Sequence, residues 1–125
     1  MANLLLVGIG GFIGAVMRYL TSDFVQRYSP ANGFPIGTLA VNVLGCLIIG
    51  LLAGVADVRE VFTPQTRTLV FVGVLGAFTT FSTFSYETAS FLNNGQIAPA
   101  LLNIGTQIAL GLAAVWLGSH LAQLV

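Results

Sequence analysis

The sequence predicts an all-α integral membrane protein, with four transmembrane helices in a single domain that covers residues 1–125. Three observations predict this fold class. Hydrophobic residues make up 56% of the 125 residues and charged residues only 6%, whereas an average soluble chain has about 25% charged residues. Four apolar runs recur, each about 20 residues long and therefore long enough to cross a bilayer core about 30 Å thick. Fifteen glycines are more than simple spans need, and they indicate close helix packing.

The apolar runs give the order of the elements, and we expect the helices at residues 2–20, 36–55, 69–91 and 97–125. The first run lacks a basic leading region and a cleavage signature, so we interpret it as a helix and not as a signal peptide. Pro35 and Pro64 stand where the first turn of a helix tolerates proline. Asn93, Asn94 and Gly95 form a turn signal that separates the last two runs.

The charges are balanced across the predicted membrane. All four basic residues are arginines, with Arg59 and Arg67 on one predicted side and Arg18 and Arg27 on the other. Orientation normally follows an excess of basic residues on the cytoplasmic side. The balance therefore predicts that either orientation inserts, giving dual topology and an antiparallel homodimer, although chance balance among four residues is the alternative. The zero net charge gives no electrostatic footprint for nucleic acid.

Two glycine pairs have the spacing of close helix contacts in lipid. Gly10 and Gly14 are four residues apart, and so are Gly50 and Gly54. Small residues at this spacing let helix backbones approach each other. We therefore expect a tightly packed bundle, and a chain this small needs a second copy to enclose a water-filled path.

The third run is unusually polar for a membrane span. Residues 73–88 contain several threonines and serines and one glutamate. Gly76, Thr79 and Thr80 together favour a local break near the middle of the bilayer, so the third helix is predicted to be broken at mid-membrane. Non-helical backbone at that depth exposes carbonyl groups, which bind cations.

Phe81 and Phe84 are three residues apart and share a helix face, with Ser82 and Thr83 between them. The positive edge of a phenyl ring can meet an anion without holding it tightly. Rings alternating with hydroxyl donors would make a conducting path. Ordinary packing of the two rings is the alternative at this point.

Arg18, Glu87 and Asn42 all fall in the same half of the predicted bilayer. Buried ionisable groups face a partner, water or the bundle interior, so Arg18 could interact with Glu87 directly or through water, or could snorkel to the interface. Asn42 could donate to an anion or link helices, and Thr38, one turn earlier, adds a donor. All four are candidate pore residues.

Three blocks of the sequence carry a resemblance: they read GGFIGAVMRY at 10–19, GTLAVNVLGCLIIG at 37–50 and GAFTTFSTFSYE at 76–87. With these blocks the chain resembles the Fluc, or CrcB, family of fluoride channels. The resemblance implies a passive channel that exports cytoplasmic fluoride across the inner membrane of a bacterial cell and so protects against fluoride toxicity. It also implies an antiparallel dual-topology homodimer with two pores and a structural sodium ion on the dimer axis.

The resemblance assigns roles by position. Backbone carbonyls of Gly76 and Thr79 from each subunit would hold the sodium ion. The pore residues it implies are Phe81, Phe84, Asn42, Ser82 and Thr83, with Arg18 at the vestibule and Thr106 as a further position on the fourth helix.

Two other classes of function are open to a chain of this kind. A small multidrug-resistance-type transporter also has four short helices, but it needs a membrane-embedded carboxylate, and Glu87 is the one available. An enzyme is not expected, since the single histidine, His120, lies far from the polar third run and no metal-ligand spacing occurs.

Overall fold

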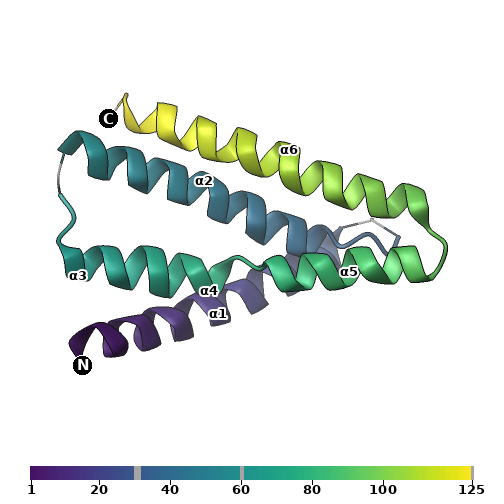
Figure 1. Cartoon of the computed structure of the whole chain (residues 1–125), viewed down its shortest axis with the longest axis horizontal. Coiled ribbons are helices and arrows are strands. Elements are labelled where there is room, and N and C mark those ends of the chain that lie inside the picture. Colours follow the sequence, from purple (N-terminus) through teal and green to yellow (C-terminus); the bar gives the residue numbers. More distant parts are fainter. Residues whose placement is uncertain (30–31, 60, 125) are drawn as a thin grey trace.

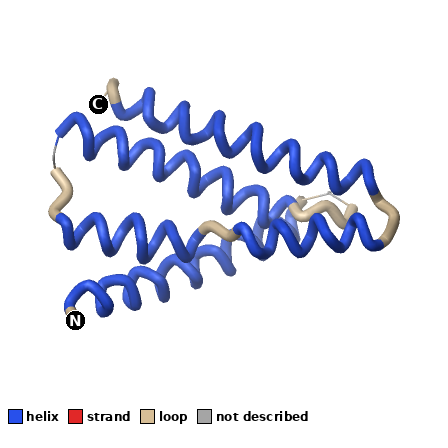
Figure 2. Tube along the Cα trace, in the orientation of Figure 1, coloured by secondary structure: helices blue, strands red, loops and turns tan. Residues whose placement is uncertain are grey.

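The computed structural model describes residues 1–29, 32–59 and 61–124, without the side chain of Val58. Pro30 and Glu60, predicted in connections, and Val125, the predicted last helical residue, lie outside these ranges. The described residues are helical with no strand, and four helical segments are long and apolar enough to cross a membrane (Figure 1, Figure 2). Both termini lie at the same end of the bundle, as four crossings require (Figure 1). The predicted four-helix architecture is thus confirmed.

The four spans consist of seven helical elements. The first, second and fourth spans are α1 (Ala2–Tyr28), α2 (Ile36–Arg59) and α6 (Ile97–Ala122). The third span, Pro64–Asn93, is composed of α3 (Pro64–Arg67), η1 (Thr68–Leu75), α4 (Gly76–Phe78) and α5 (Phe81–Asn93). η1 has the wider i→i+5 turns of a π-helix.

The end of α1 corrects the sequence prediction. We expected the helix to end at Leu20 and the chain to be a connection from Thr21, but α1 continues to Tyr28. The added turns are polar, which is why hydropathy alone does not include them. An ion pair one turn apart, between Arg27 Nε and Asp23 Oδ1 at 2.8 Å, supports this end of the helix.

The start of the third span agrees with the prediction that Pro64 occupies a first turn. Thr63 is the N-cap of α3, and its side chain accepts a hydrogen bond from the Thr66 amide at 3.2 Å. Pro64 follows directly, where its missing N–H costs no helical hydrogen bond. At the other end of the span, Gly95 has a positive φ of 70° in the turn that leads to α6.

The predicted glycine contact of α1 is confirmed, and it joins α1 to the third span. A Cβ atom on Gly10 would lie 2.9 Å from the Cα of Gly73, and one on Gly14 would overlap the carbonyl of Val74. Backbones this close leave no room for a side chain. The first and third spans therefore depend on glycine for their packing.

The α2 and α6 helices run in the same direction, side by side (Figure 1). Their contacts follow one register, in which partners are 65 positions apart in sequence, as for Asn42 and Gln107. In the same register Gly111 faces Cys46, and Gly50 faces Val115, whose backbone a Cβ atom on Gly50 would strike. The contact repeats every four residues, the spacing of one helix ridge.

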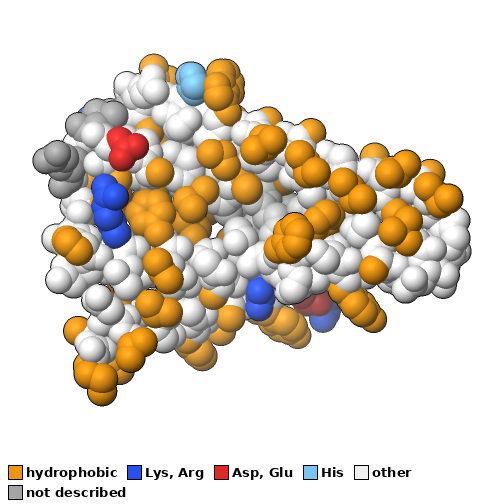
Figure 3. Space-filling view, in the orientation of Figure 1, with side chains coloured by type: hydrophobic (Ala, Val, Ile, Leu, Met, Phe, Trp, Pro, Cys, Tyr) orange, Lys and Arg blue, Asp and Glu red, His pale blue; other side chains and the backbone are white. Residues whose placement is uncertain are grey.

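Hydrophobic side chains are spread over the whole visible outer face, with few charged groups among them (Figure 3). The α1 helix is long enough to cross a membrane. On it, Leu4, Phe12 and Leu20 are all exposed in the isolated chain. A water-soluble fold would bury such residues. The chain is accordingly a multi-pass membrane protein.

The Gly14 contact gives a stability prediction. Gly14→Ala places a methyl group on the Val74 carbonyl, and overpacking of this kind costs about 1–3 kcal/mol. Gly8→Ala is the matched control on the same helix, because nothing lies within 4 Å of its added Cβ atom. Heating each variant in detergent and following the size-exclusion peak should show earlier loss for Gly14→Ala alone. Equal heat resistance of the two variants would contradict this packing.

Candidate functional site

The third span contains a two-residue step of extended backbone, here called the Thr79–Thr80 step. Thr79 has φ −88° and ψ 158°, and Thr80 has φ −149° and ψ 117°. Helical conformation resumes at Phe81 because Thr80 is a good N-cap, with Oγ1 accepting from the Thr83 amide at 3.2 Å. The step appears as the loop segment between two helices in Figure 2.

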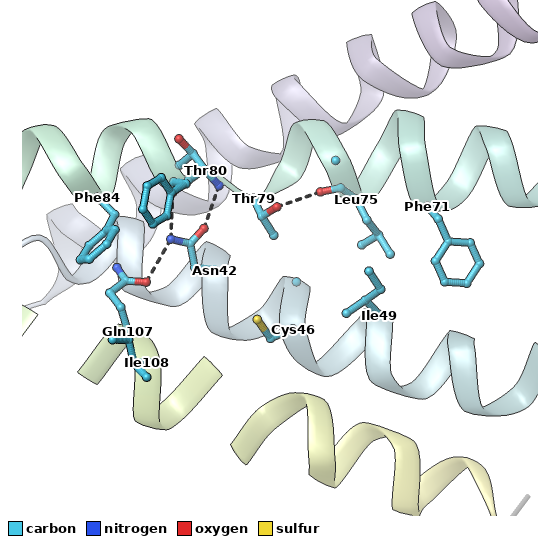
Figure 4. A pocket seen from close by; sticks show the side chains of 13 residues that line it. Asn42, Cys46, Ile49, Phe71, Leu75, Thr79, Thr80, Phe84, Gln107 and Ile108 are labelled. Atoms are coloured by element: carbon cyan, nitrogen blue, oxygen red, sulfur yellow. Dashed lines mark hydrogen bonds between the residues drawn. The ribbon is translucent and has the colours of Figure 1, made fainter. Parts of the chain in front are cut away.

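Asn42 of α2 holds the Thr79–Thr80 step by hydrogen bonds to both the N–H and the C=O group of Thr80. Its Oδ1 accepts from the Thr80 amide at 2.8 Å, and its Nδ2 donates to the Thr80 carbonyl at 3.0 Å. The second Nδ2 hydrogen goes to Gln107 Oε1 on α6, also at 3.0 Å (Figure 4). Asn42 therefore uses all of its amide hydrogens inside the chain and links three spans.

The step frees the two carbonyl groups that were expected to hold sodium. In a continuous helix the Gly76 carbonyl would accept from the Thr80 amide, but that amide donates to Asn42 Oδ1. Likewise the Thr79 carbonyl would accept from the Thr83 amide, which donates to Thr80 Oγ1. Two carbonyl oxygens thus lose their helical donors to identified side chains. They are hard oxygen ligands, and they fit the requirements of a sodium ion.

Five of the predicted site residues line one cavity of about 370 Å³, here called the phenylalanine cavity. They are Phe81, Phe84, Asn42, Gly76 and Thr79 (Figure 4). The two rings meet edge-on, with centroids 5.4 Å apart, and both rings line the cavity. Phe81 is 77% exposed in the isolated chain.

Three other predicted residues, Arg18, Thr38 and Thr83, line a second cavity of about 400 Å³, here called the arginine cavity. Its remaining lining residues include the polar Ser22, Asp23 and Gln26 of α1. Thr80 borders both cavities. The Thr79–Thr80 step is therefore the wall that the two spaces share.

The remaining two predicted residues, Ser82 and Glu87, line neither cavity. The Ser82 hydroxyl lies 3.3 Å from Thr80 Oγ1. Glu87 accepts a short hydrogen bond from Thr38 Oγ1, so the direct contact with Arg18 that we considered does not form. Among the described residues the ion pair is Arg27–Asp23, and no cluster of three His, Cys, Asp or Glu side chains occurs there.

Gln107 and Thr80 also line the phenylalanine cavity, although neither is among the predicted pore or sodium residues. Gln107 stands four residues after Asn103 on a mostly apolar helix, and this pair of amides one turn apart was the available signal. Thr106, which was expected instead, turns its hydroxyl to the carbonyls of Leu102 at 2.8 Å and Asn103 at 3.2 Å. It borders neither of the two cavities.

Comparison with known proteins gives a consistent result. Residues 5–119 match the family described as CrcB-like protein, Camphor Resistance (CrcB). Three relatives are each named fluoride-specific ion channel FluC. The protein from Methylobacillus flagellatus is 42% identical, covering 99% of this chain and 97% of the relative. That from Nitratidesulfovibrio vulgaris is 42% identical over 100% of both, and that from Sulfurovum sp. is 49% identical over 94% and 91%.

Proposed function

Because this chain belongs to the CrcB-like family, we propose that it is a fluoride-selective passive ion channel. The observation that carries the proposal is the end-to-end similarity to relatives named fluoride-specific ion channels. Fluoride enters cells as the neutral acid and is trapped as the anion at neutral pH, so a passive pore in a bacterial inner membrane would export it and limit its toxicity. The small multidrug-resistance-type transporter is not favoured, since the matched relatives are channels.

We infer that the anion passes along the arginine and phenylalanine cavities. Arg18 would raise the local anion concentration at the mouth through its charge. The Thr83 hydroxyl on the wall of the arginine cavity would replace part of the water that the anion sheds, and the rings of Phe81 and Phe84 would then meet the anion weakly enough to let it leave. Asn42 would act by holding the Thr79–Thr80 step, because its amide hydrogens are already used.

The working unit in this proposal is an antiparallel dual-topology homodimer with two pores. Support comes from the balanced arginines and from the exposed Phe81, which is 77% accessible in the isolated chain. Gly76 is also exposed, so a second copy could approach it. The carbonyls of Gly76 and Thr79 from both subunits would then hold a sodium ion at mid-membrane, where its charge would stabilise carbonyl oxygens that lack helical donors.

A flux measurement tests the function directly. Purified protein in liposomes loaded with fluoride should release it rapidly, whereas liposomes loaded with chloride should release almost none, because the larger anion does not gain from contacts sized for fluoride. Ion-selective electrodes measure both. Protein-free liposomes give the leak rate, and chloride efflux as fast as fluoride efflux would rule out selectivity.

Labelling of the termini tests the dimer arrangement. In intact cells, a cysteine added beyond the N-terminus should react with a membrane-impermeant reagent in about half of the molecules, since equal arginine counts allow both insertions. Permeabilised cells give the total amount of the added cysteine that the reagent can label. In a variant with two extra arginines on one side of the membrane, the labelled fraction should move toward all or none of the molecules. A functional wild-type sample labelled on one side only would exclude dual topology.

A further inference from the structure

Buried polar atoms without partners occur between α2, α5 and α6. Asn103 of α6 is 0% exposed. Its Nδ2 donates to Thr88 Oγ1 at 3.0 Å, but its Oδ1 has no hydrogen-bond partner among the described residues. On α5, Glu87 Oε1 accepts from Thr38, while Glu87 Oε2 is buried and also lacks a partner there. Native proteins rarely leave such atoms unsatisfied.

The register of α2 against α6 brings these two oxygens to the same layer of the bundle. Partners 65 positions apart face each other, as Asn42 and Gln107 do. One turn earlier the same register sets Thr38 opposite Asn103. Since Thr38 holds Glu87, the side chains that carry the two free oxygens belong to the same layer of the bundle.

A third unpartnered atom lies one turn along α6. Gln107 Nε2 is buried with no hydrogen-bond partner in the described part of the chain, because Gln107 meets Asn42 through Oε1. Helical side chains lean toward the N-terminus of their helix, so the Gln107 amide leans toward the Asn103 layer. The layer thus brings together two acceptors and one donor without partners.

This set of atoms selects the chemistry of its occupant. A bare anion would be repelled by two acceptor oxygens, and a hard cation needs about six oxygen ligands and no facing N–H group. A molecule that donates two hydrogen bonds and accepts one satisfies all three atoms. We propose that this layer holds one internal water molecule, which donates to Glu87 Oε2 and Asn103 Oδ1 and accepts from Gln107 Nε2. Three hydrogen bonds are typical of a buried water.

The proposed water lies inside one chain, so it is independent of the channel proposal and of the dimer. An experimental structure of the full chain in lipid, at a resolution that shows ordered water, tests it. We expect a density peak within hydrogen-bonding distance of both Glu87 Oε2 and Asn103 Oδ1. Direct contact between these two oxygens, or an empty map at this place, would overturn the proposal.

Two variants separate a specific water site from general hydration. Asn103→Leu removes the acceptor, and the peak should disappear. Thr88→Val removes the partner of Asn103 Nδ2 and a hydrogen bond to the Phe84 carbonyl of its own helix, but it keeps the Asn103 Oδ1 acceptor, so the peak should remain. A peak that survives Asn103→Leu refutes the assignment, and if that variant does not fold, the wild-type map and Thr88→Val still decide the question.

Discussion

Phe84→Ile and Phe81→Ile are each expected to reduce fluoride efflux by up to about tenfold, with a larger loss in the double variant. An aromatic contact is worth up to about 1.5 kcal/mol, and each 1.4 kcal/mol of barrier is about a factor of ten in rate. Isoleucine roughly keeps the volume, so stability should change by less than about 1.5 kcal/mol. Fluoride efflux from liposomes and size-exclusion chromatography measure the two effects separately.

A matched control is available on α1. Phe12 is 72% exposed and borders neither cavity, so Phe12→Ile should leave efflux unchanged. The alternative, that Phe81 and Phe84 only pack, forecasts the opposite outcome for the two cavity variants. Intact protein with wild-type efflux in both would remove them from the pore.

Asn42→Leu should be the most destabilising single change at the site. It leaves the Thr80 amide, the Thr80 carbonyl and Gln107 Oε1 without their partner. Each unsatisfied group costs about 1–3 kcal/mol, so the loss for the three groups is roughly 3–9 kcal/mol. The freed Thr80 amide can return to the Gly76 carbonyl and make the span a continuous helix. Thermal loss of the size-exclusion peak and fluoride efflux should both reveal the change.

Thr106→Val is the control for this substitution. The Thr106 hydroxyl bonds only to carbonyls of its own helix, so its removal should be nearly neutral. Asn42→Asp keeps an acceptor for the Thr80 amide but sets its second oxygen against two other acceptors, the Thr80 carbonyl and Gln107 Oε1, so it should also lower heat resistance. An Asn42→Leu variant as heat-resistant as the wild type would show that the three hydrogen bonds do not hold the step.

The sequence was sufficient for the number and order of the spans because hydropathy, proline and glycine signals agree along the chain. It was insufficient for the end of α1, where a polar segment continues the helix with an ion pair between Arg27 and Asp23. Hydropathy identifies only the apolar part of a helix, which can lie in lipid. A helix can continue beyond that part as a polar segment.

The candidate site was predictable where the residues are close in sequence, as in the segment from Gly76 to Phe84. It was not predictable where contacts are distant. Gln107 meets Asn42 across 65 positions, and a partner at that separation follows only from the parallel register of two helices. The Thr38–Glu87 contact, which we had not expected, depends on how α5 faces α2.

The Thr79–Thr80 step also has an electrostatic consequence. The helical run 64–78 ends there and α5 begins there, so the negative end of one helix dipole and the positive end of another meet within two residues. Each end is equivalent to about half an elementary charge. The negative end lies at the Gly76 carbonyl, and the positive end, with its free amides, lies at Phe81. A neutral backbone thereby presents opposite partial charges to neighbouring places in the membrane, without the desolvation cost of a charged side chain.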